Sequence, residues 1–415
     1  MDMQVKAGDW NADELAAVPG KLQPFIDGGA LSGVVTLAWQ GGEVAQVNTV
    51  GSRDLERNAP MQRDTLFRIA SMTKPVTTAA ALMLMEQGEL KLDDPITRFA
   101  PEFADMRVLK DAAGPLDQHE PAHRVITIED LMTHRSGLAY GFTSSGPIAK
   151  AHDEALGSPL DSNRTPDEWM AALASLPLSY KPGERLHYSH ATEVLGFIVG
   201  RIAGAPLGDV LQDRIFGPLG MTDTAFHVPA AKRDRAAVLY RFDDAAEKLV
   251  PVPMPHYDEA PAYQAGGGGL WSTADDYLRF ARMLLGNGEV DGVRLLKPET
   301  VADMRTNRLT PEQRQVPFLG MPMWAGMGFG LGLSVVDAPE NNMMGVGSVG
   351  SFGWPGAFGT WWQADPVKDL ILIYMIQHSI PLTPNAGEAI AAGRGFAGRM
   401  ALPVYQRAIY DALGA

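Results

Sequence analysis

Strand-like segments near both ends of the chain enclose a long middle that is dominated by helical patterns. Residues 34–39 and 44–50 are rich in apolar and β-branched side chains, and the Gly-Gly pair between them is typical of a hairpin turn. Residues 358–363 and 370–377 are again strand-like, and a polar stretch that contains a proline separates them. Because both chain ends supply strands, we expect one antiparallel sheet that is built from the two ends.

The middle of the chain predicts helices that are separated by Pro- and Gly-rich connections. With 46% hydrophobic and 20% charged residues in 415, the chain has the composition of a folded globular protein. The expected helices cover residues 71–87, 127–135, 167–176, 191–203, 206–216 and 273–286. We therefore expect an α/β plus helical fold. Residues 1–68 and 322–415 would form the domain with the sheet, residues 69–321 a mainly helical domain, and the active site would lie between them.

Composition excludes several classes of site and partner. The chain has no cysteine, which removes thiol nucleophiles, disulfides, iron–sulfur clusters and cysteine-based zinc sites. The net charge of −14 has the wrong sign for binding nucleic acid or an anionic membrane surface. The N-terminus has neither a basic start nor an apolar core, and the longest strongly apolar run, residues 370–376, is far shorter than a membrane span. We expect a soluble, cytoplasmic protein.

The tetrapeptide Ser71-Met72-Thr73-Lys74 stands at the start of a predicted helix. A serine hydroxyl is a weak nucleophile until a base lies within hydrogen-bond reach. Residues three apart at a helix start share one face, so the Lys74 amine can reach the Ser71 hydroxyl. The positive end of the helix dipole would also stabilise an oxyanion beside Ser71. Because lysines are common in first helical turns, this pattern needs further elements before it indicates catalysis.

Two later stretches supply candidates for the rest of an acyl-transfer site. Tyr188 lies in a loop before the helix predicted over residues 191–203, where its phenol could act as a base near a lysine ammonium. The glycine-rich residues 351–360 lead into a predicted strand and leave backbone N–H groups free to hold an oxyanion. A buried structural tyrosine and a tight turn are the alternative interpretations of these two segments.

The three elements together resemble the motifs of the serine β-lactamase and penicillin-binding-protein superfamily. They read Ser71-x-x-Lys74, Tyr188-Ser189-His190 and Trp354-Pro355-Gly356. The chain is most similar to the family VIII carboxylesterases, which share the class C β-lactamase fold, and residues 92–95, 131–138, 217–222 and 267–276 are also typical of that group. The resemblance implies a β-lactamase/transpeptidase-like fold, with an antiparallel sheet flanked by helices and a mainly helical second domain.

The resemblance also assigns roles to individual residues. Ser71, Lys74 and Tyr188 would be catalytic, and the backbone N–H groups of Ser71 and Ala357 would form the oxyanion hole. Substrate contacts would come from Trp354, Gly356 and His190.

Two of these positions depart from the β-lactamase pattern. His190 stands where β-lactamases usually have an asparagine, and Trp354 stands where they have a lysine that is associated with the substrate carboxylate. An indole ring cannot pair with a carboxylate as an ammonium does, so neutral esters are favoured over β-lactams.

Two other motifs match cofactor-binding patterns in an unsuitable context. Residues 119–123 match H-E-x-x-H, but Pro121 argues against the continuous helix that such a zinc site requires. Residues 345–350 match G-x-G-x-x-G, but no predicted helix follows them. We expect neither a metal nor an organic cofactor.

The sequence thus predicts a serine hydrolase that cleaves short-chain carboxylic esters through an acyl-enzyme on Ser71. A β-lactamase, a D-amino-acid peptidase or an acyltransferase could use the same site, and a non-hydrolytic sensor that is acylated without turnover is a further alternative. The expected partner is a small-molecule ester, with no nucleic acid and no membrane. The natural acyl and alcohol groups and the oligomeric state are left open.

Overall fold

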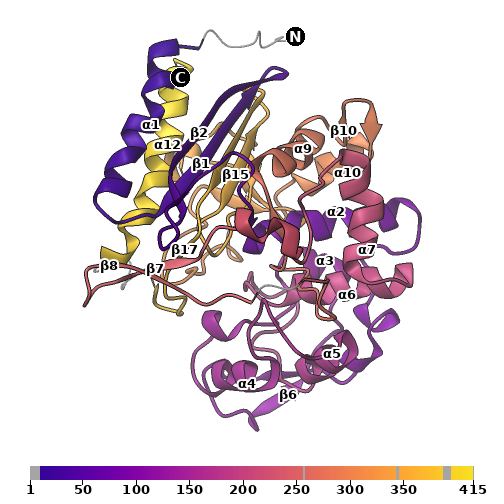
Figure 1. Ribbon diagram of the computed structural model, residues 1–415. Helices are drawn as coiled ribbons and strands as arrows, with labels where there is room; N and C mark the ends of the chain where they lie inside the picture. The colour runs from indigo at the N-terminus through magenta and orange to yellow at the C-terminus, as the bar shows by residue number, and fades with distance from the viewer. Residues whose placement is uncertain (1–9, 256–257, 343–344, 387–393, 415) are drawn as a thin grey trace.

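An eight-stranded antiparallel sheet that is built from both ends of the chain organises the structure (Figure 1). The computed structural model describes residues 10–255, 258–342, 345–386 and 394–414. In spatial order the strands are β12 (Met327–Phe329), β13 (Ser334–Val336), β14 (Phe352–Gly353), β15 (Trp361–Asp365), β16 (Leu370–Met375), β1 (Gly33–Gln40), β2 (Glu43–Asp54) and β3 (Ala59–Pro60). The expectation of one sheet from the two chain ends is confirmed.

The centre of the sheet joins the two ends of the chain directly. Leu37 of β1 lies opposite Val47 of β2 on one side and opposite Ile373 of β16 on the other. Every residue of β1 is buried, because helices cover both faces of the sheet. Gly41 and Gly42 have φ values of 59° and 99°, which a β-carbon would strain, and they turn β1 into β2 as predicted.

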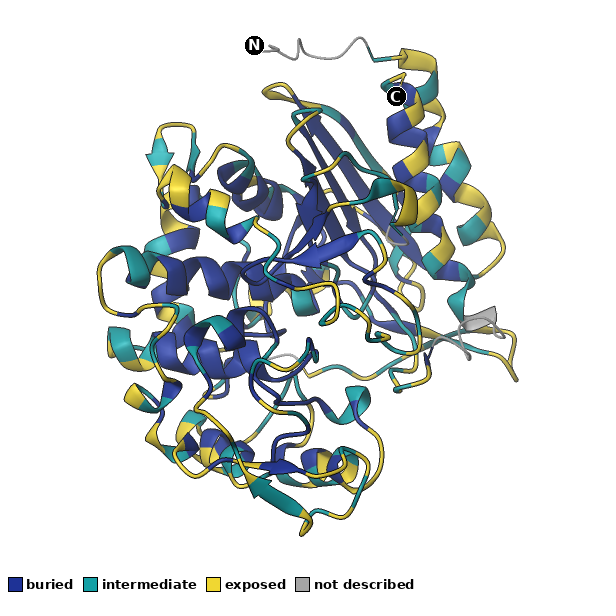
Figure 2. Ribbon diagram, turned by 180° about the vertical axis from the view of Figure 1, so that it is seen from behind, coloured by how far each residue is buried: buried dark blue, intermediate teal, exposed yellow. Residues whose placement is uncertain are grey.

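Helices form the outer layers. On one face α1 (Ala12–Asp27) and α12 (Ala401–Ala412) lie side by side, and their buried side chains pack against those of β1 and β16 (Figure 1). On the other face α9 (Ala274–Leu285) places Tyr277 and Phe280 against Trp362 of β15. Figure 2 shows the consequence: the central strands β1, β15 and β16 are buried, whereas α1 and α12 expose the side that faces away from the sheet.

The remaining elements lie beyond α9 and along the edges of the sheet (Figure 1). The helices are α2 (Thr73–Glu86), α3 (Ile128–Met132), α4 (Pro147–Leu156), α5 (Pro166–Ala174), α6 (Ala191–Ala203), α7 (Leu207–Leu211), α8 (Gly217–Leu219) and α10 (Pro298–Met304). The short strands pair as β4 (Phe67–Arg68) with β9 (Trp271–Ser272), β5 (Arg107–Leu109) with β6 (His119–Pro121), β10 (Glu289–Val290) with β11 (Val293–Arg294), and β7 (Tyr240–Asp243) with both β8 (Lys248–Pro251) and β17 (His378–Ser379).

Several predicted boundaries differ from the structure. The strand predicted over residues 358–363 is β15, which begins only at Trp361, because Gly359 has a φ of 89° and the chain turns before it. The helix predicted over residues 206–216 is interrupted, since a π-helical turn at Gln212–Phe216 separates α7 from α8. Helices α1, α4, α10 and α12 were not predicted from the sequence.

The proposed division into two domains stays a prediction. Helix α9 lies within residues 69–321 but packs directly on β15 and β16 of the sheet. No single helix in the described ranges is long and apolar enough to span a membrane.

Candidate active site

Ser71 lies in a sharp turn between a short strand and a helix. The 3-10 turn η1 (Ala70–Met72) follows β4 and runs directly into α2. Ala70 has a φ of 45°, a conformation that L-residues rarely adopt, and it redirects the chain just before the serine. The turn is held from outside, because Tyr277 Oη donates to the Met72 carbonyl at 2.8 Å. Ser71 is left half-buried at the N-terminal end of the helix, on the wall of a cavity.

Lys74 is completely buried one helical turn after Ser71. Its Nζ lies 3.3 Å from Ser71 Oγ, 3.2 Å from Tyr140 Oη and 2.6 Å from the Gly267 carbonyl oxygen. Three acceptors match the three N–H donors of an ammonium group. The predicted contact between Ser71 and Lys74 is therefore present, and two further groups fix the lysine.

Tyr188 lies on the other side of the same lysine. Its ring centroid is 4.6 Å from Lys74 Nζ, and its hydroxyl accepts a hydrogen bond from Trp354 Nε1 at 3.2 Å. Thr143 Oγ1 donates to the Tyr188 carbonyl at 2.9 Å and fixes the loop. The structure thus brings together the three residues that the sequence proposed as catalytic, and it places Trp354 in direct contact with one of them.

A buried tyrosine–glutamate pair that the sequence did not reveal supports Lys74. Tyr140 Oη donates to the Glu193 carboxylate, at 2.8 Å from Oε1 and 3.0 Å from Oε2. Burial and then the nearby carboxyl raise the pKa of the Tyr140 phenol well above its usual value, so the phenol stays protonated. Burial raises the pKa of Glu193, and the charge on Lys74 opposes this effect. Glu193, Tyr140 and Lys74 form one continuous polar chain inside the protein.

The third motif approaches Ser71 through a glycine. A β-carbon on Gly356 would lie 2.1 Å from Thr360 Oγ1 and 2.3 Å from the Ile69 carbonyl oxygen, so no larger residue fits. Thr360 Oγ1 itself donates to that carbonyl at 3.1 Å. Within the described residues, neither the N–H of Ser71 nor that of Ala357 has a hydrogen-bond acceptor. Two donors on adjoining segments are therefore available for a ligand.

A cavity of about 370 Å³ opens beside Ser71. This volume lies in the range of pockets that hold small-molecule ligands. Trp354, Gly356 and Ala357 line it together with Tyr188. Most of the remaining wall is apolar, with Phe142, Phe318, Met321, Met323, Phe396 and Leu402 among the lining residues.

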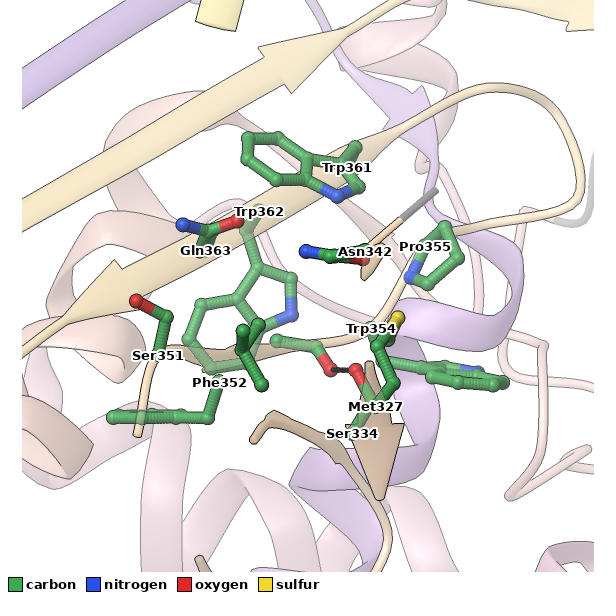
Figure 3. A pocket seen from close by; sticks show the side chains of 12 residues that line it. Met327, Ser334, Asn342, Ser351, Phe352, Trp354, Pro355, Trp361, Trp362 and Gln363 are labelled. Carbon is green, nitrogen blue, oxygen red and sulfur yellow. Dashed lines mark hydrogen bonds between the residues drawn. The ribbon is translucent and has the colours of Figure 1, made fainter. Parts of the chain in front are cut away.

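A second, much smaller cavity lies behind the third motif (Figure 3). It measures about 20 Å³ and is lined by Trp354, Pro355, Trp361 and Trp362, among others. A space of this size holds roughly one water molecule. Of these two cavities, the one beside Ser71 is large enough to hold an organic substrate, and the one behind the third motif is not.

His190, which the sequence proposed as a substrate contact, lies away from the cavity in this structure. Its ring is buried and packs against Tyr140 at 4.3 Å and Trp169 at 5.2 Å between centroids, and it does not line the larger cavity. His190 directly precedes α6, and the chain there directs its ring into the interior, behind Tyr140. Burial lowers the pKa of His190 well below its usual value, so the ring is neutral.

The motif that resembled a zinc site is not helical. His119 and Glu120 lie in β6, where His119 pairs with Leu109. Among the described residues, no three histidine or carboxylate side chains are arranged to hold a metal ion.

Comparison with known proteins agrees with this geometry. The family model described as "Beta-lactamase" matches residues 18–394. This chain belongs to the beta-lactamase family. It is 55% identical to protein Rv1367c of Mycobacterium tuberculosis strain H37Rv over 95% of this chain and 98% of that protein. It is also 33% identical to the esterase EstB of Burkholderia gladioli, over 87% of this chain and 91% of EstB.

A solved structure extends the likeness to three dimensions. EstCE1, described as "a hydrolase with promiscuous acyltransferase activity", matches with a TM-score of 0.75 at 28% identity, over 94% of this chain and 99% of EstCE1. The β-lactamase-like fold expected from the sequence is confirmed, and the beta-lactamase family supplies both esterases and acyltransferases among the relatives.

Four largely buried histidines near the beta-lactamase-type site make the stability of the fold sensitive to acid. Burial lowers the pKa of His134 and His190 well below the usual value, that of His152 to about 4 and that of His187 to about 3. In the unfolded chain a histidine has a pKa of about 6.5. The unfolded state therefore binds more protons below this pH, and stability that is present above about pH 6.5 is lost as the pH falls toward 4. Each histidine contributes up to about 1.4 kcal/mol per pH unit in that window.

Denaturant unfolding between pH 7.5 and 4.5 measures this effect. The His152→Gln variant should show a shallower loss of stability than the native protein, and His123→Gln, which changes an exposed side chain, should follow the native curve. A free energy of unfolding that is constant between pH 7 and pH 5 would contradict the prediction.

Proposed function

We propose that this protein is a serine esterase that works in two steps through an acyl-enzyme on Ser71. The observation that carries the proposal is the contact of 3.3 Å between Ser71 Oγ and Lys74 Nζ at the wall of a large apolar cavity. A nucleophile with an adjacent base and two free N–H donors is the arrangement that acyl transfer requires. The esterase relative EstB supports the choice of an ester as the substrate.

In the first step Ser71 Oγ attacks the ester carbonyl, and the proton of its hydroxyl passes to the Lys74–Tyr188 pair, which enters the step with the Lys74 ammonium beside a deprotonated Tyr188 oxygen. The N–H groups of Ser71 and Ala357 hold the negative charge that develops on the carbonyl oxygen. The bond between the carbonyl carbon and the alcohol oxygen then breaks, and Tyr188 returns the proton to the departing alcohol. In the second step water attacks the acyl carbon and gives a proton to Tyr188. The bond between the acyl carbon and Ser71 Oγ then breaks, Tyr188 returns the proton to Ser71, and the carboxylic acid leaves.

Tyr140 and Glu193 act as positioning residues in this scheme. The Tyr140 hydroxyl donates to Glu193, so its oxygen lone pair faces Lys74 Nζ at 3.2 Å. Together with the Gly267 carbonyl it fixes the amine, which leaves one N–H direction for Ser71. The cavity wall also bears on substrate choice, because the Trp354 ring offers no charge to the carboxylate of a β-lactam.

Transfer of the acyl group to an alcohol instead of water is a second candidate. A mainly apolar cavity beside the acyl-enzyme holds little water and can bind an apolar alcohol. The description of EstCE1 as a hydrolase with promiscuous acyltransferase activity supports this reading.

Removal of the nucleophile tests the proposal directly. Ser71→Ala should lower kcat for p-nitrophenyl butyrate by roughly three or more orders of magnitude, as loss of a catalytic nucleophile usually does. The exposed Ser175 provides the control, since Ser175→Ala should keep native turnover. A fluorophosphonate should label the peptide that contains Ser71 and no other. Near-native turnover in a folded Ser71→Ala protein would end the hypothesis.

The role of the Tyr140–Glu193 pair is tested by removing the negative charge of Glu193. Glu193→Gln removes a negative charge from the coupled groups of the site, so their protonated form is less stabilised and the acidic limb of the pH profile of kcat/KM should move to lower pH. Activity at neutral pH should still fall, by up to about 100-fold, because Tyr140 loses the charged acceptor that orients it and Lys74 is no longer held in place. Tyr140→Phe breaks the same chain and should cause a comparable loss.

A second tyrosine–glutamate pair gives the matched control for that experiment. Tyr240 Oη donates to Glu56 Oε2 at 2.6 Å, away from the site. Glu56→Gln should therefore leave the pH profile in place. An unshifted profile in Glu193→Gln would remove Glu193 from the mechanism.

Substrate preference separates an esterase from a β-lactamase. The native protein should hydrolyse p-nitrophenyl butyrate with a far larger kcat/KM than nitrocefin. Trp354→Lys should lower the ratio of kcat/KM for the ester to kcat/KM for nitrocefin. In free energy this change should be at most about 1–3 kcal/mol, the value of a hydrogen bond to a charged group. It should also slow ester hydrolysis, because Tyr188 loses its hydrogen bond from Trp354 Nε1. Equal efficiency of the native protein on both substrates would replace the esterase assignment by the lactamase one.

A further inference from the structure

The cavity beside Ser71 has polar groups on part of its otherwise apolar wall. Arg399 lies in the 3-10 segment η8 (Arg394–Met400), and Tyr374 lies in β16. Both residues line the cavity that Ser71 also lines. Phe396, Met400 and Leu402 surround this region with apolar surface. The Arg399 guanidinium and the Tyr374 hydroxyl are polar groups in a mainly apolar cavity wall, where such groups usually have a binding partner.

Arg399 uses only part of its hydrogen-bonding capacity. Its Nη2 donates to the carbonyl oxygens of Ala357 at 2.5 Å and of His378 at 2.6 Å. Its Nε is buried and has no acceptor, and no carboxylate in the described ranges forms an ion pair with the side chain. Burial lowers the pKa of Arg399 to about 10, which leaves the guanidinium positively charged at neutral pH.

The hydroxyl of Tyr374 also lacks a hydrogen-bond partner. The side chain is fully buried from solvent. Burial raises the pKa of the phenol, so the group is a neutral donor at physiological pH. A buried hydroxyl without a partner costs about 1–3 kcal/mol, and a buried charge without a counter-ion costs more. Both costs would be offset by one ligand that carries a negative charge and accepts hydrogen bonds.

We propose that Arg399 and Tyr374 form a carboxylate-binding subsite, and that the substrate of Ser71 is an ester that also carries a carboxylate group. The inference rests on the proposed esterase function and adds the class of substrate. Planar guanidinium groups match the geometry of a carboxylate, and a phenol adds a second donor. The apolar surface around the subsite would hold the hydrocarbon part that joins the carboxylate to the ester.

The subsite is distinct from a role of Arg399 as a structural clamp. The clamp, which ties the Ala357 and His378 carbonyls together, uses Nη2 alone and leaves Nε without an acceptor. It also gives no role to the Tyr374 hydroxyl. Nor does the subsite coincide with the third motif, where Trp354 is apolar. Because Arg399 contacts the carbonyl of Ala357, the carboxylate would bind beside the residue whose N–H is a proposed oxyanion donor.

The test compares two esters with acyl chains of equal length. p-Nitrophenyl hydrogen glutarate carries a terminal carboxylate, and p-nitrophenyl pentanoate is its neutral counterpart. The native protein should favour the acidic ester in kcat/KM. Tyr374→Phe should lower this acid-to-neutral ratio by about 10-fold, the effect of one hydrogen bond to a charged group, and Arg399→Gln should lower it further. Since the Tyr374 hydroxyl has no partner in the protein, its removal breaks no internal hydrogen bond.

Tyr405→Phe is the matched control. Tyr405 stacks on Tyr374 at 5.9 Å, but its hydroxyl donates to the Leu37 carbonyl and lies outside the cavity lining. This variant should keep the native acid-to-neutral ratio.

A second arm of the experiment uses 4-carboxyphenyl pentanoate, which carries the carboxylate on the alcohol. A larger kcat/KM for either acidic ester, which is lost in Tyr374→Phe and Arg399→Gln, supports the subsite. Equal kcat/KM values for acidic and neutral esters in the native protein overturn it.

Binding to an inactive protein separates the two proposals. Monobenzyl glutarate should bind Ser71→Ala protein in calorimetry, and Tyr374→Phe in the same background should weaken binding by about 10-fold. If neither p-nitrophenyl ester is hydrolysed by the native protein, the esterase proposal fails, and this titration still decides the subsite. If the esters are hydrolysed but the titration shows no dependence on Arg399 or Tyr374, only the subsite fails.

Discussion

The buried ammonium of Lys74 is the constraint around which the site is built. A lysine charge in a protein interior is costly unless its donors are met by acceptors in good geometry. Here the acceptors come from three separate places in the chain: a hydroxyl one turn earlier, the Tyr140 phenol and the Gly267 carbonyl. Any shift of these segments would leave a charged N–H unpaired. The loops that carry them are therefore held in place by the lysine as much as the lysine is held by them.

The sheet and the helical part meet at a contact that only glycine permits. The missing β-carbon of Gly356 lets the chain before β15 touch the Ile69 carbonyl, and Thr360 donates to the same oxygen. The turn that carries Ser71 and the loop that carries Ala357 thereby share one anchor, although they lie almost 300 residues apart in the chain. Their spacing, on which the proposed oxyanion hole depends, is set by backbone packing and does not rely on a flexible side chain.

Local patterns predicted the parts of this structure that local chemistry determines. The hairpin at Gly41 and Gly42, the helix over residues 191–203 and the Ser71–Lys74 contact all follow from residues close together in sequence. Tyr140 and Glu193 were missed because their pairing joins segments that no local pattern connects. A carboxylate in the first turn of an otherwise apolar helix was the available signal for Glu193. Helix α1 was missed since Pro19 and Pro24 interrupt its pattern. The burial of the His190 ring was not foreseen, because the motif does not tell which way the ring points.

The pairing of β1 with β16 has a consequence for folding during synthesis on the ribosome. Leu37 emerges early, but its neighbour Ile373 is made after about 330 further residues, which takes roughly 20–70 s at typical synthesis rates. During that time the N-terminal hairpin has an open, strongly apolar edge of the kind that pairs with other chains. In the nascent chain the free edge of β1 must be kept from pairing with other chains until β16 has been synthesised. Its yield in a cell therefore depends on chaperone supply and translation speed as well as on the stability of the finished fold.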